Sequence, residues 1–306
     1  MKEVQVRQPK NIILAVDGSV HSTASAALLC DLPLPPGSTI MILAVIVPRE
    51  ASDYTACMAL LNQAKAVFEG RQYAVKTELL TGYPSEMLTS YGEANPPDLM
   101  ILGAKGLRAT INILLGGVAQ QLIEYAPWPV LVVRSPYHGL KRVLFATDGS
   151  KFSRCALDDI MTFPFPAETE IRAIHILPAY RMIDTAYPHY THGAEVFTPY
   201  IFREAGASEE MNAILAEEER EGDLLMADTL SQLEKVFSAP VGVVRRGDAA
   251  TEILDYIRDN KIDLVISGSR GLSRLKGLFL GSVSRKLAHY SSSSVMVVKG
   301  GSYGTN

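Results

Sequence analysis

The sequence predicts an α/β protein made of two tandem, doubly wound, Rossmann-like domains, each built on a parallel sheet. Short runs of apolar residues alternate along the chain with stretches of helical periodicity, and runs this uniformly apolar are typical of strands buried on both faces. A set of landmarks occurs twice in the same order, so the chain is a tandem duplication. The length of 306 residues fits two domains of ordinary size.

Five segments of the first half return in the second half. The aligned pairs, first half against second, are 11–19 with 142–150, 40–48 with 170–178, 78–82 with 243–247, 97–106 with 262–271, and 116–134 with 281–299. We place domain 1 at residues 1–136 and domain 2 at residues 139–306. The second aligned pair sets Pro48 opposite Pro178.

The second domain is longer because it carries an insertion. Asp17 and Asp148 are 131 residues apart, whereas Gly103 and Gly268 are 165 apart. We place the irregular part of this insertion at about 179–208, a stretch rich in Tyr, His and Pro.

The first elements of the chain follow one another as strand, helix, strand, helix. The apolar run at 13–16 predicts a strand, and the Asp-Gly-Ser turn after it is a common helix start, so 22–29 is predicted as a helix. The run at 41–47 predicts the second strand. Apolar residues at intervals of three and four predict a helix over 54–68.

The later elements of the first half repeat this alternation. The runs at 99–102 and 130–133 predict two further buried strands, and 118–124, which follows a glycine pair, predicts the helix between them. The same order in the second half predicts the same elements there. One addition is an acidic helix at about 208–237, directly after the irregular part of the insertion.

Composition limits the classes of partner. The 29 basic and 33 acidic residues give a net charge of −4, so neither nucleic acid nor an anionic membrane is an expected partner. The longest apolar run, 40–47, is far shorter than the roughly 20 residues of a membrane-spanning helix. The first residues lack the apolar core of a secretory signal. We therefore expect a soluble, cytoplasmic protein.

The residues at strand ends matter most, because ligands of doubly wound sheets bind beyond the carboxyl ends of the strands. Asp17 and Asp148 each follow the first strand of their half, within Asp-Gly-Ser. Such a carboxylate can accept hydrogen bonds from a ligand, or it can cap the following helix. Taken from one copy alone, capping is the more common role.

A glycine array follows the fourth predicted strand of the second half. It runs from Gly268 and Gly271 over nine residues to Gly281, which is followed by Ser282 and, two positions later, Ser284. Glycines let a backbone approach a ligand closely, and a helix that opens at Gly281 presents free amides to an anion. The two serines add hydroxyl donors, so the pattern predicts a phosphate site.

Three basic residues, Arg270, Arg274 and Lys276, lie in the loop between the glycines and add positive charge there. The alternative interpretation is a glycine-rich turn that only permits tight packing. The combination of spacing, serines and strand context favours anion binding.

The array G-x2-G-x9-G-S after an apolar strand, together with the aspartate after the first strand, resembles the universal stress protein family. The chain is similar to its tandem two-domain members over nearly its whole length, apart from the insertion. The resemblance implies an adenine nucleotide alpha-hydrolase-like fold in each half. It also implies an intramolecular pseudo-dimer in which the last strands, 129–133 and 295–298, pair with each other; association into a homodimer stays open.

Many members of that family bind ATP or AMP, whereas others lack the motif and bind no nucleotide. The resemblance implies that the second half binds ATP or AMP, with or without Mg²⁺. Asp148 would lie against the adenosine, and the backbone at Ile176 would face the adenine. The ribose and phosphates would be held by Ser267, Gly268, Arg270, Gly271, Gly281, Ser282, Val283 and Ser284.

The first half keeps the glycine spacing but departs from the motif. Gly117 replaces the first serine and Ala119 replaces the second. A hydrogen bond contributes about 0.5–1.5 kcal/mol net, or about 1.5–3 kcal/mol when one group is charged, so this site is expected to be weaker or empty. Its residues would be Asp17, Ile46, Gly103, Gly106, Gly116 and Gly117.

Other chemistries have weaker support. The chain lacks a P-loop motif, and His189, His192 and Glu195 invite a metal hypothesis that Pro188 and Gly193 disfavour. Catalytic residues are not evident.

The leading hypothesis is a nucleotide-dependent regulatory module of the stress response. The alternatives are a slow ATP hydrolase, in which Asp148 holds a metal or orients water, and a nucleotide-free scaffold that binds partners through its insertion.

Overall fold

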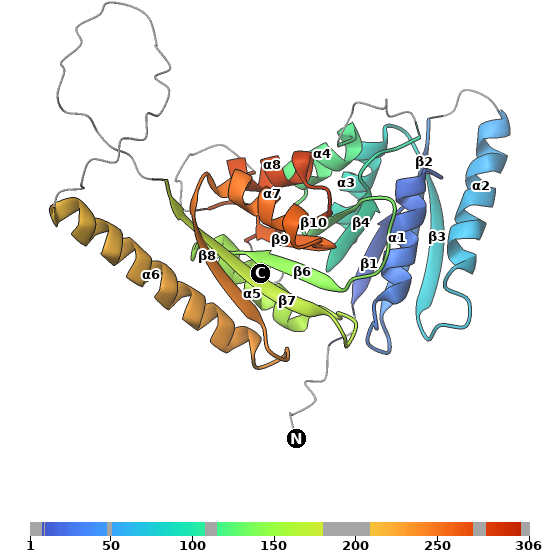
Figure 1. Cartoon of the computed structure of the whole chain (residues 1–306). Helices are drawn as coiled ribbons and strands as arrows, with labels where there is room; N and C mark the ends of the chain where they lie inside the picture. The colour runs from blue at the N-terminus through green and yellow to red at the C-terminus, as the bar shows by residue number, and fades with distance from the viewer. Residues whose placement is uncertain are drawn as a thin grey trace, which may run out of the picture.

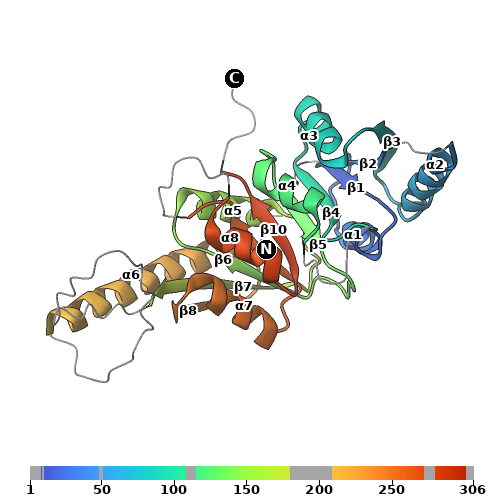
Figure 2. The same ribbon diagram turned by 90° about the horizontal axis from the view of Figure 1, so that it is seen from above.

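The computed structural model describes residues 8, 10–47, 51–107, 115–179, 209–271 and 280–300. It shows one ten-stranded, mostly parallel sheet with helices on both faces (Figures 1 and 2). The strand order is β3-β2-β1-β4-β5-β10-β9-β6-β7-β8, so each half contributes five adjacent strands in the same internal order. The predicted doubly wound α/β class is confirmed.

Nine elements of the first half alternate between strand and helix. They are β1 Asn11–Ala15, α1 Val20–Asp31, β2 Thr39–Ile46, α2 Ala51–Ala66, β3 Ala74–Thr81, α3 Pro84–Ala94, β4 Leu99–Gly103, α4 Gly117–Tyr125 and β5 Val130–Val133. The predicted helices at 22–29, 54–68 and 118–124 lie within three residues of the observed ends.

The second half repeats these elements in the same order. They are β6 Arg142–Ala146, α5 Lys151–Thr162, β7 Glu170–Pro178, α6 Glu209–Leu233, β8 Val241–Gly247, α7 Ala249–Asp259, β9 Leu264–Gly268, α8 Ser282–Tyr290 and β10 Ser294–Val298. The helix predicted at 208–237 is α6, which ends four residues earlier than predicted.

Part of the extra length of the second half is helical. α6 has 25 residues, whereas its counterpart α2 has 16. The irregular segment and the metal hypothesis at 189–195 lie outside the described residues. In the portion of the chain that the structure describes, no helix combines the length and apolar character needed to cross a membrane.

The two halves join through their last strands. β5 and β10 pair antiparallel, with Leu131 opposite Met296, whereas the other neighbouring strands of the sheet pair in parallel. This is the strand pairing that the family resemblance implied. The edge of each half-sheet is covered by the other half, which prevents pairing with a second chain at these apolar strands.

The two halves share one register between their first two strands. The N–H of Val16 donates to the carbonyl of Leu43 (2.8 Å), and the N–H of Thr147 donates to the carbonyl of Ile174 (3.0 Å). Leu43 is thus the structural counterpart of Ile174, 131 residues apart, which is the same offset that relates Asp17 to Asp148.

This register corrects the sequence alignment by one residue. The alignment of Pro48 with Pro178 is wrong, and Val45, not Ile46, is the counterpart of Ile176. Neighbouring residues of a strand point to opposite faces, so Ile46 points away from the face that Val45 and Ile176 share. Matching the two prolines gave the wrong register, because backbone hydrogen bonds between strands, and not residue types, set the register.

Two apolar clusters fill the space between the sheet and its two helical layers. One face packs under α1, α2, α5 and α6, and the other under α3, α4, α7 and α8. Representative fully buried contacts are Leu28 on the first face and Leu122, Trp128 and Leu287 on the second. The inner strands are buried on both faces, which explains why their sequences are uniformly apolar, whereas the edge strands β3 and β8 are partly exposed.

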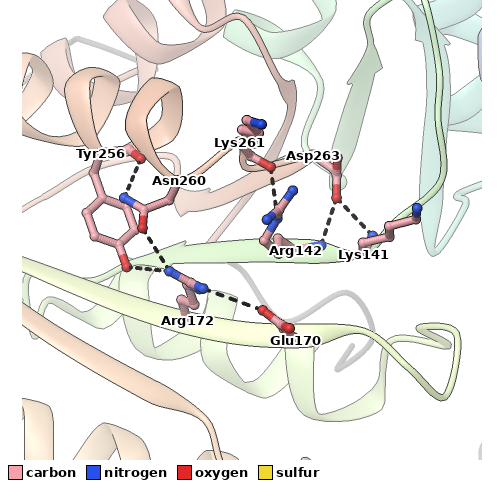
Figure 3. Close-up of polar contacts among 8 residues, drawn as sticks. All are labelled: Lys141, Arg142, Glu170, Arg172, Tyr256, Asn260, Lys261 and Asp263. Atoms are coloured by element: carbon pink, nitrogen blue, oxygen red, sulfur yellow. Dashed lines mark hydrogen bonds and ion pairs between the residues drawn. The ribbon is translucent and has the colours of Figure 1, made fainter.

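At the amino edge of the sheet, a carboxylate holds the start of the first strand in each half. Asp98 Oδ2 accepts the N–H of Asn11 (2.7 Å). Its counterpart Asp263 accepts the N–H groups of Lys141 (2.9 Å) and Arg142 (2.7 Å) with one oxygen (Figure 3). These carboxylates are structural, and they lie opposite the edge where ligands of such sheets bind.

A polar network beside them fixes α7 on β7 in the second half only. Arg172 donates to the hydroxyl of Tyr256 (3.3 Å) and to Asn260 Oδ1 (2.9 Å), and it pairs with Glu170 (3.5 Å; Figure 3). The register places Met41 at the first-half position of Arg172. The two repeats therefore use different chemistry to hold equivalent helices.

Two buried cations cross between the halves. Arg134, just after β5, donates to the carbonyl of Ala288 (2.7 Å) at the end of α8. Lys299, just after β10, donates to backbone carbonyls at the end of α4, including that of Glu124 (3.4 Å). Glu124 also pairs with Arg285 of α8 (3.5 Å). Each half thus stabilises the C-terminus of the other half's last helix, where a cation is electrostatically favoured.

Candidate functional site

The predicted site residues gather at the carboxyl ends of the strands, next to the N-termini of α4 and α8. In the first half, Asp17 joins two loops there. Its Oδ1 accepts the N–H of Ser19 (3.0 Å), and its Oδ2 accepts the N–H of Leu107 (3.2 Å). The helix cap is Ser19, whose Oγ accepts the N–H of Ser22 (3.1 Å). Asp17 therefore ties the loop after β1 to the loop after β4.

The second half repeats this arrangement. Asp148 Oδ1 accepts the N–H of Ser150 (3.0 Å), and Ser150 caps α5 by accepting the N–H of Ser153 (3.2 Å). A Cβ on Gly271 would lie 2.5 Å from Asp148 Oδ2, so the carboxylate lies directly against the glycine loop. The capping role considered for the aspartates is wrong, because the serine two residues later provides the cap in both halves.

Gly103 and Gly268 serve helix packing. A Cβ on Gly268 would lie 2.6 Å from the backbone carbon of Phe152, in the first turn of α5. A Cβ on Gly103 would lie 2.8 Å from the backbone carbon of His21 in α1. These glycines let a helix cross the strand end closely, which is the packing interpretation that the sequence left open.

Gly116 and Gly281 open α4 and α8. Their own N–H groups donate to the carbonyls of Ala104 and Ser269, both at 2.7 Å. Neither helix has a side-chain cap, whereas α1, α5 and α7 do. The first-turn amides of α4 and α8 are therefore not taken by a capping side chain, and they sit at the carboxyl edge of the sheet. Such an end favours an anion or a hydrogen-bond acceptor.

The two serines of α8 differ in what they present. Ser284 is buried, and its Oγ donates to the carbonyl of Gly268 (2.7 Å) while lying 3.4 Å from Ser267 Oγ. This hydroxyl holds α8 against β9 and has already donated its proton. Ser282, in the first turn, is exposed. Of these two serines, Ser282 is therefore the one whose hydroxyl can donate to a ligand at the helix start.

A cavity of about 350 Å³ lies in the first half at this edge. Five predicted residues line it, namely Asp17, Gly103, Gly106, Gly116 and Gly117. Val45 lines it where Ile46 had been predicted, in agreement with the corrected register. Its volume is within the range of small-molecule sites.

Sequence reasoning missed other parts of the wall. Leu88 from α3 and Leu43 from β2 line the cavity together with Leu102 from β4. Their apolar character marked them only as core residues. The lining role depends on how the third helix docks on the sheet, and no short motif encodes that.

Basic residues surround both sites. Lys105 lines the first-half cavity. Burial, with a contribution from Lys105, lowers the pKa of His21, whose Nδ1 accepts the N–H of Ser135 (2.9 Å). In the second half the guanidinium of Arg270 lies over the ring of Phe152, 5.5 Å from its centre. Positive charge near the strand ends thus occurs in both halves.

Metal ligands do not cluster in the described ranges, where no group of three or more His, Cys, Asp or Glu side chains is arranged to hold an ion. His175 Nδ1 lies 2.9 Å from the carbonyl of Thr147.

Comparison with known proteins agrees with this architecture. A sequence model of the universal stress protein family matches residues 9–134 and again residues 139–299. A universal stress protein of Mycolicibacterium smegmatis is 25% identical over 323 aligned positions, covering 97% of this chain and 99% of the relative.

A solved structure shares the fold over nearly the whole chain. A universal stress protein of Archaeoglobus fulgidus superposes with a TM-score of 0.61 at 19% identity, covering 96% of this chain and 100% of that one. A universal stress protein family member of Arabidopsis thaliana, solved with AMP bound, matches with a TM-score of 0.32 at 16% identity, over 41% of this chain and 92% of that one. Because the family's sequence model matches both halves, this chain belongs to the universal stress protein family.

Proposed function

We propose that the second half of this chain binds ATP or AMP and that the protein acts as a nucleotide-dependent regulatory module. The observation that carries the proposal is the start of α8. This helix begins at Gly281 without a side-chain cap, next to the loop that holds Asp148 and Gly271. Its first-turn amides and the exposed Ser282 suit a phosphate group.

Each residue of the site has a distinct proposed role. Phosphate oxygens accept hydrogen bonds from the amides of Ser282 and Val283 and from the Ser282 hydroxyl. The Asp148 carboxylate, which accepts the N–H of Ser150 and lies against the glycine loop, accepts from a ribose hydroxyl in this proposal. The backbone at Ile176 faces the adenine. Ser267, Gly268 and Ser284 position β9 against α5 and α8.

The first half binds nucleotide more weakly in this proposal. Gly117 stands where the second half has Ser282, so the exposed hydroxyl at the helix start is lost. Alanine at position 119 weakens phosphate binding less than the missing hydroxyl suggests, because the equivalent Ser284 hydroxyl already donates to the backbone. The difference in phosphate binding therefore depends mainly on Gly117.

Two measurements test the assignment. Nucleotide that leaves the purified protein on denaturation is identified by mass spectrometry, and ATP and AMP are titrated by calorimetry. We expect one tight site per chain. Absence of both a released nucleotide and a binding isotherm would instead favour the scaffold, and phosphate release that scales with protein concentration and is lost in Asp148→Ala would favour the hydrolase.

A proline substitution decides which helix holds the phosphates. Ser282→Pro removes both the hydroxyl and the first amide, yet proline is favoured at the first helical position. The backbone of Gly281, at φ −69° and ψ 157°, is already the conformation preferred before proline. We expect ATP affinity to fall by about tenfold to a hundredfold in calorimetry, as loss of hydrogen bonds to a charged group predicts.

The matched control is Gly117→Pro in the first half. Gly116 has nearly the same backbone, at φ −73° and ψ 152°, so the change is equally well tolerated by the fold. We expect the tight site to keep its ATP affinity. The proposal fails if Gly117→Pro weakens binding while Ser282→Pro leaves it intact.

A further inference from the structure

We infer that the cavity of the first half is a binding site for an uncharged, largely apolar small molecule that carries a hydrogen-bond acceptor. This ligand class differs from the nucleotide proposed for the second half. The inference comes from the way the two repeats diverge at equivalent positions around one strand edge.

Hydroxyl groups have been lost from the cavity wall at five positions. Val16, Leu102, Ala104, Gly117 and Ala119 line the cavity. At each of their counterparts, 131 or 165 residues further along the chain, the second half has a serine or threonine. The first-half wall therefore has none of the side-chain hydroxyls that the equivalent surface of the second half carries.

The apolar part of the wall is kept in both halves. Leu43, Val45 and Leu88 line the cavity, and isoleucine stands at each counterpart in the second half. The divergence is thus confined to polar groups. A cavity lined in this way gains free energy when it buries an apolar molecule. The charged side chains in its lining are Lys105 and Asp17, whose two oxygens accept the N–H groups of Ser19 and Leu107.

Two of the replaced positions are neighbours in space. In the second half, Ser284 donates to the carbonyl of Gly268 (2.7 Å) beside Ser267. In the first half, Leu102 and Ala119 stand at these positions, and both side chains are buried. The double replacement puts two apolar side chains where the second half has two neighbouring hydroxyls.

The surroundings of the cavity are apolar as well. Tyr83, next to the lining residue Pro84, is 68% exposed, and Leu107, next to Gly106, is 69% exposed. The counterpart of Tyr83 is Asp248. Large apolar side chains left in solvent beside a cavity are typical of a ligand entrance.

The acceptor group of the ligand follows from α4. This helix starts at the cavity without a side-chain cap, and Gly117 and Val118 of its first turn line the wall. A carbonyl oxygen can accept from these amides without bringing a full charge into an apolar cavity.

The test uses 6-propionyl-2-dimethylaminonaphthalene, an uncharged fluorophore with one ketone whose emission shifts to shorter wavelength in apolar surroundings. We expect saturable binding at one site per chain. ATP at a concentration that fills the tight site of the second half, but not the weaker site of the first half, leaves this binding in place. Displacement of the fluorophore in proportion to bound ATP would overturn the inference.

Lining variants locate the probe. Leu102→Ser with Ala119→Ser copies the second-half pair into the first half, and we expect about tenfold or greater loss of probe affinity, since it removes apolar contact area. Ala119→Leu fills the cavity instead and is expected to reduce binding similarly. Circular dichroism identifies a variant that fails to fold. The lining variant that does fold then shows whether the probe binds in the cavity.

The matched control is Leu224→Ser on α6, which removes an exposed leucine far along the chain from the cavity. We expect unchanged probe binding. Probe affinity that falls in this control but not in the lining variants would mean non-specific surface association, and the inference would be wrong. The nucleotide proposal is judged separately by ATP calorimetry on the unmodified protein.

Discussion

At the scale of single residues, the motif glycines have three different roles. Gly268 lets α5 cross the end of β9, Gly271 leaves room for the Asp148 carboxylate, and Gly281 opens α8. The same roles recur in the first half. Identical residue types at motif spacing therefore serve helix packing, loop contact and the opening of an uncapped helix in turn, and only the last would contribute directly to the proposed phosphate site.

Gly268→Ala tests the packing role. The added Cβ would lie 2.6 Å from backbone atoms of Phe152, which cannot rotate away. We expect the free energy of unfolding to fall by about 2–4 kcal/mol in urea denaturation. Gly117→Ala is the control, because a Cβ there meets nothing within 4 Å, and its stability is expected to stay within about 1 kcal/mol of the original. Equal losses in both variants would contradict this assignment.

At the scale of elements, the helices at the carboxyl edge differ in how they start, and α3, whose first residue is Pro84, lacks a side-chain cap as α4 and α8 do. Serine caps α1 and α5, and an aspartate caps α7, so their first-turn amides are partly used within the protein. α4 and α8 start uncapped but are held firmly at their other ends. Arg134 and Lys299 donate to their C-terminal carbonyls from across the pseudo-dimer. The N-terminal ends of α4 and α8 are thus left without a side-chain cap, while their C-terminal ends are fixed.

Arg134→Met tests the value of such an anchor. The substitution removes the guanidinium that donates to the carbonyl of Ala288, and methionine cannot replace that hydrogen bond. We expect a loss of about 1.5–3 kcal/mol in the free energy of unfolding. Arg285→Met removes a half-exposed partner of Glu124 and should cost less than about 1 kcal/mol. Comparable losses in the two variants would show that Arg134 is no more than a surface charge.

At the scale of the whole molecule, the two halves act as one body because their sheets and helices interlock. β5 and β10 pair across the junction, and a cation from each half enters the other. The arrangement is symmetric in backbone and asymmetric in chemistry. Arginine occupies one anchor position and lysine the other, just as hydroxyls line one strand edge and apolar side chains the other.

Lys299 makes this junction sensitive to pH. Burial, with a smaller contribution from Arg270, lowers the pKa of Lys299 to about 8. In the unfolded chain a lysine has a pKa of about 10.4, so between about pH 8 and 10.4 the unfolded state binds more protons. The free energy of unfolding therefore rises with pH across that window. Below pH 8 the lysine is charged in the folded protein, and the full cost of burying that charge lowers the stability.

The comparison is with Lys299→Met. Between pH 8 and 10.4 we expect the free energy of unfolding of the original protein to increase relative to that of the variant by up to about 3 kcal/mol. Urea denaturation at each pH measures both values. Arg134→Met is the control, since arginine keeps its proton throughout this range. A difference between the original protein and Lys299→Met that stays constant with pH would rule out the lowered pKa.

Much of the fold could be predicted because strand and helix patterns are local. The apolar runs and the helices at 22–29, 54–68 and 118–124 follow from periodicity, and the duplication follows from self-comparison. The equivalence of Ile46 and Ile176 failed by one residue. A register depends on hydrogen bonds between strands, and a matching proline at a strand end carries no information about them.

The candidate site was predictable in position but not in detail. The aspartates and glycines were placed at the strand ends from their spacing. Their roles were not, because whether Asp17 caps a helix or ties two loops depends on Leu107, 90 residues away along the chain. Ser284 likewise looks like a phosphate donor in the sequence, but its proton goes to the backbone of a neighbouring strand.

The sequence by itself determined that this protein is a duplicated α/β unit with an unequal pair of glycine motifs. Periodicity and repetition are properties of the chain, so they survive without coordinates. Only the tertiary structure decided which hydroxyls are already bonded, which glycines let helices pack closely, and that the half without the motif serines contains a cavity. Those facts depend on distances between segments remote in the chain, which folding alone brings together.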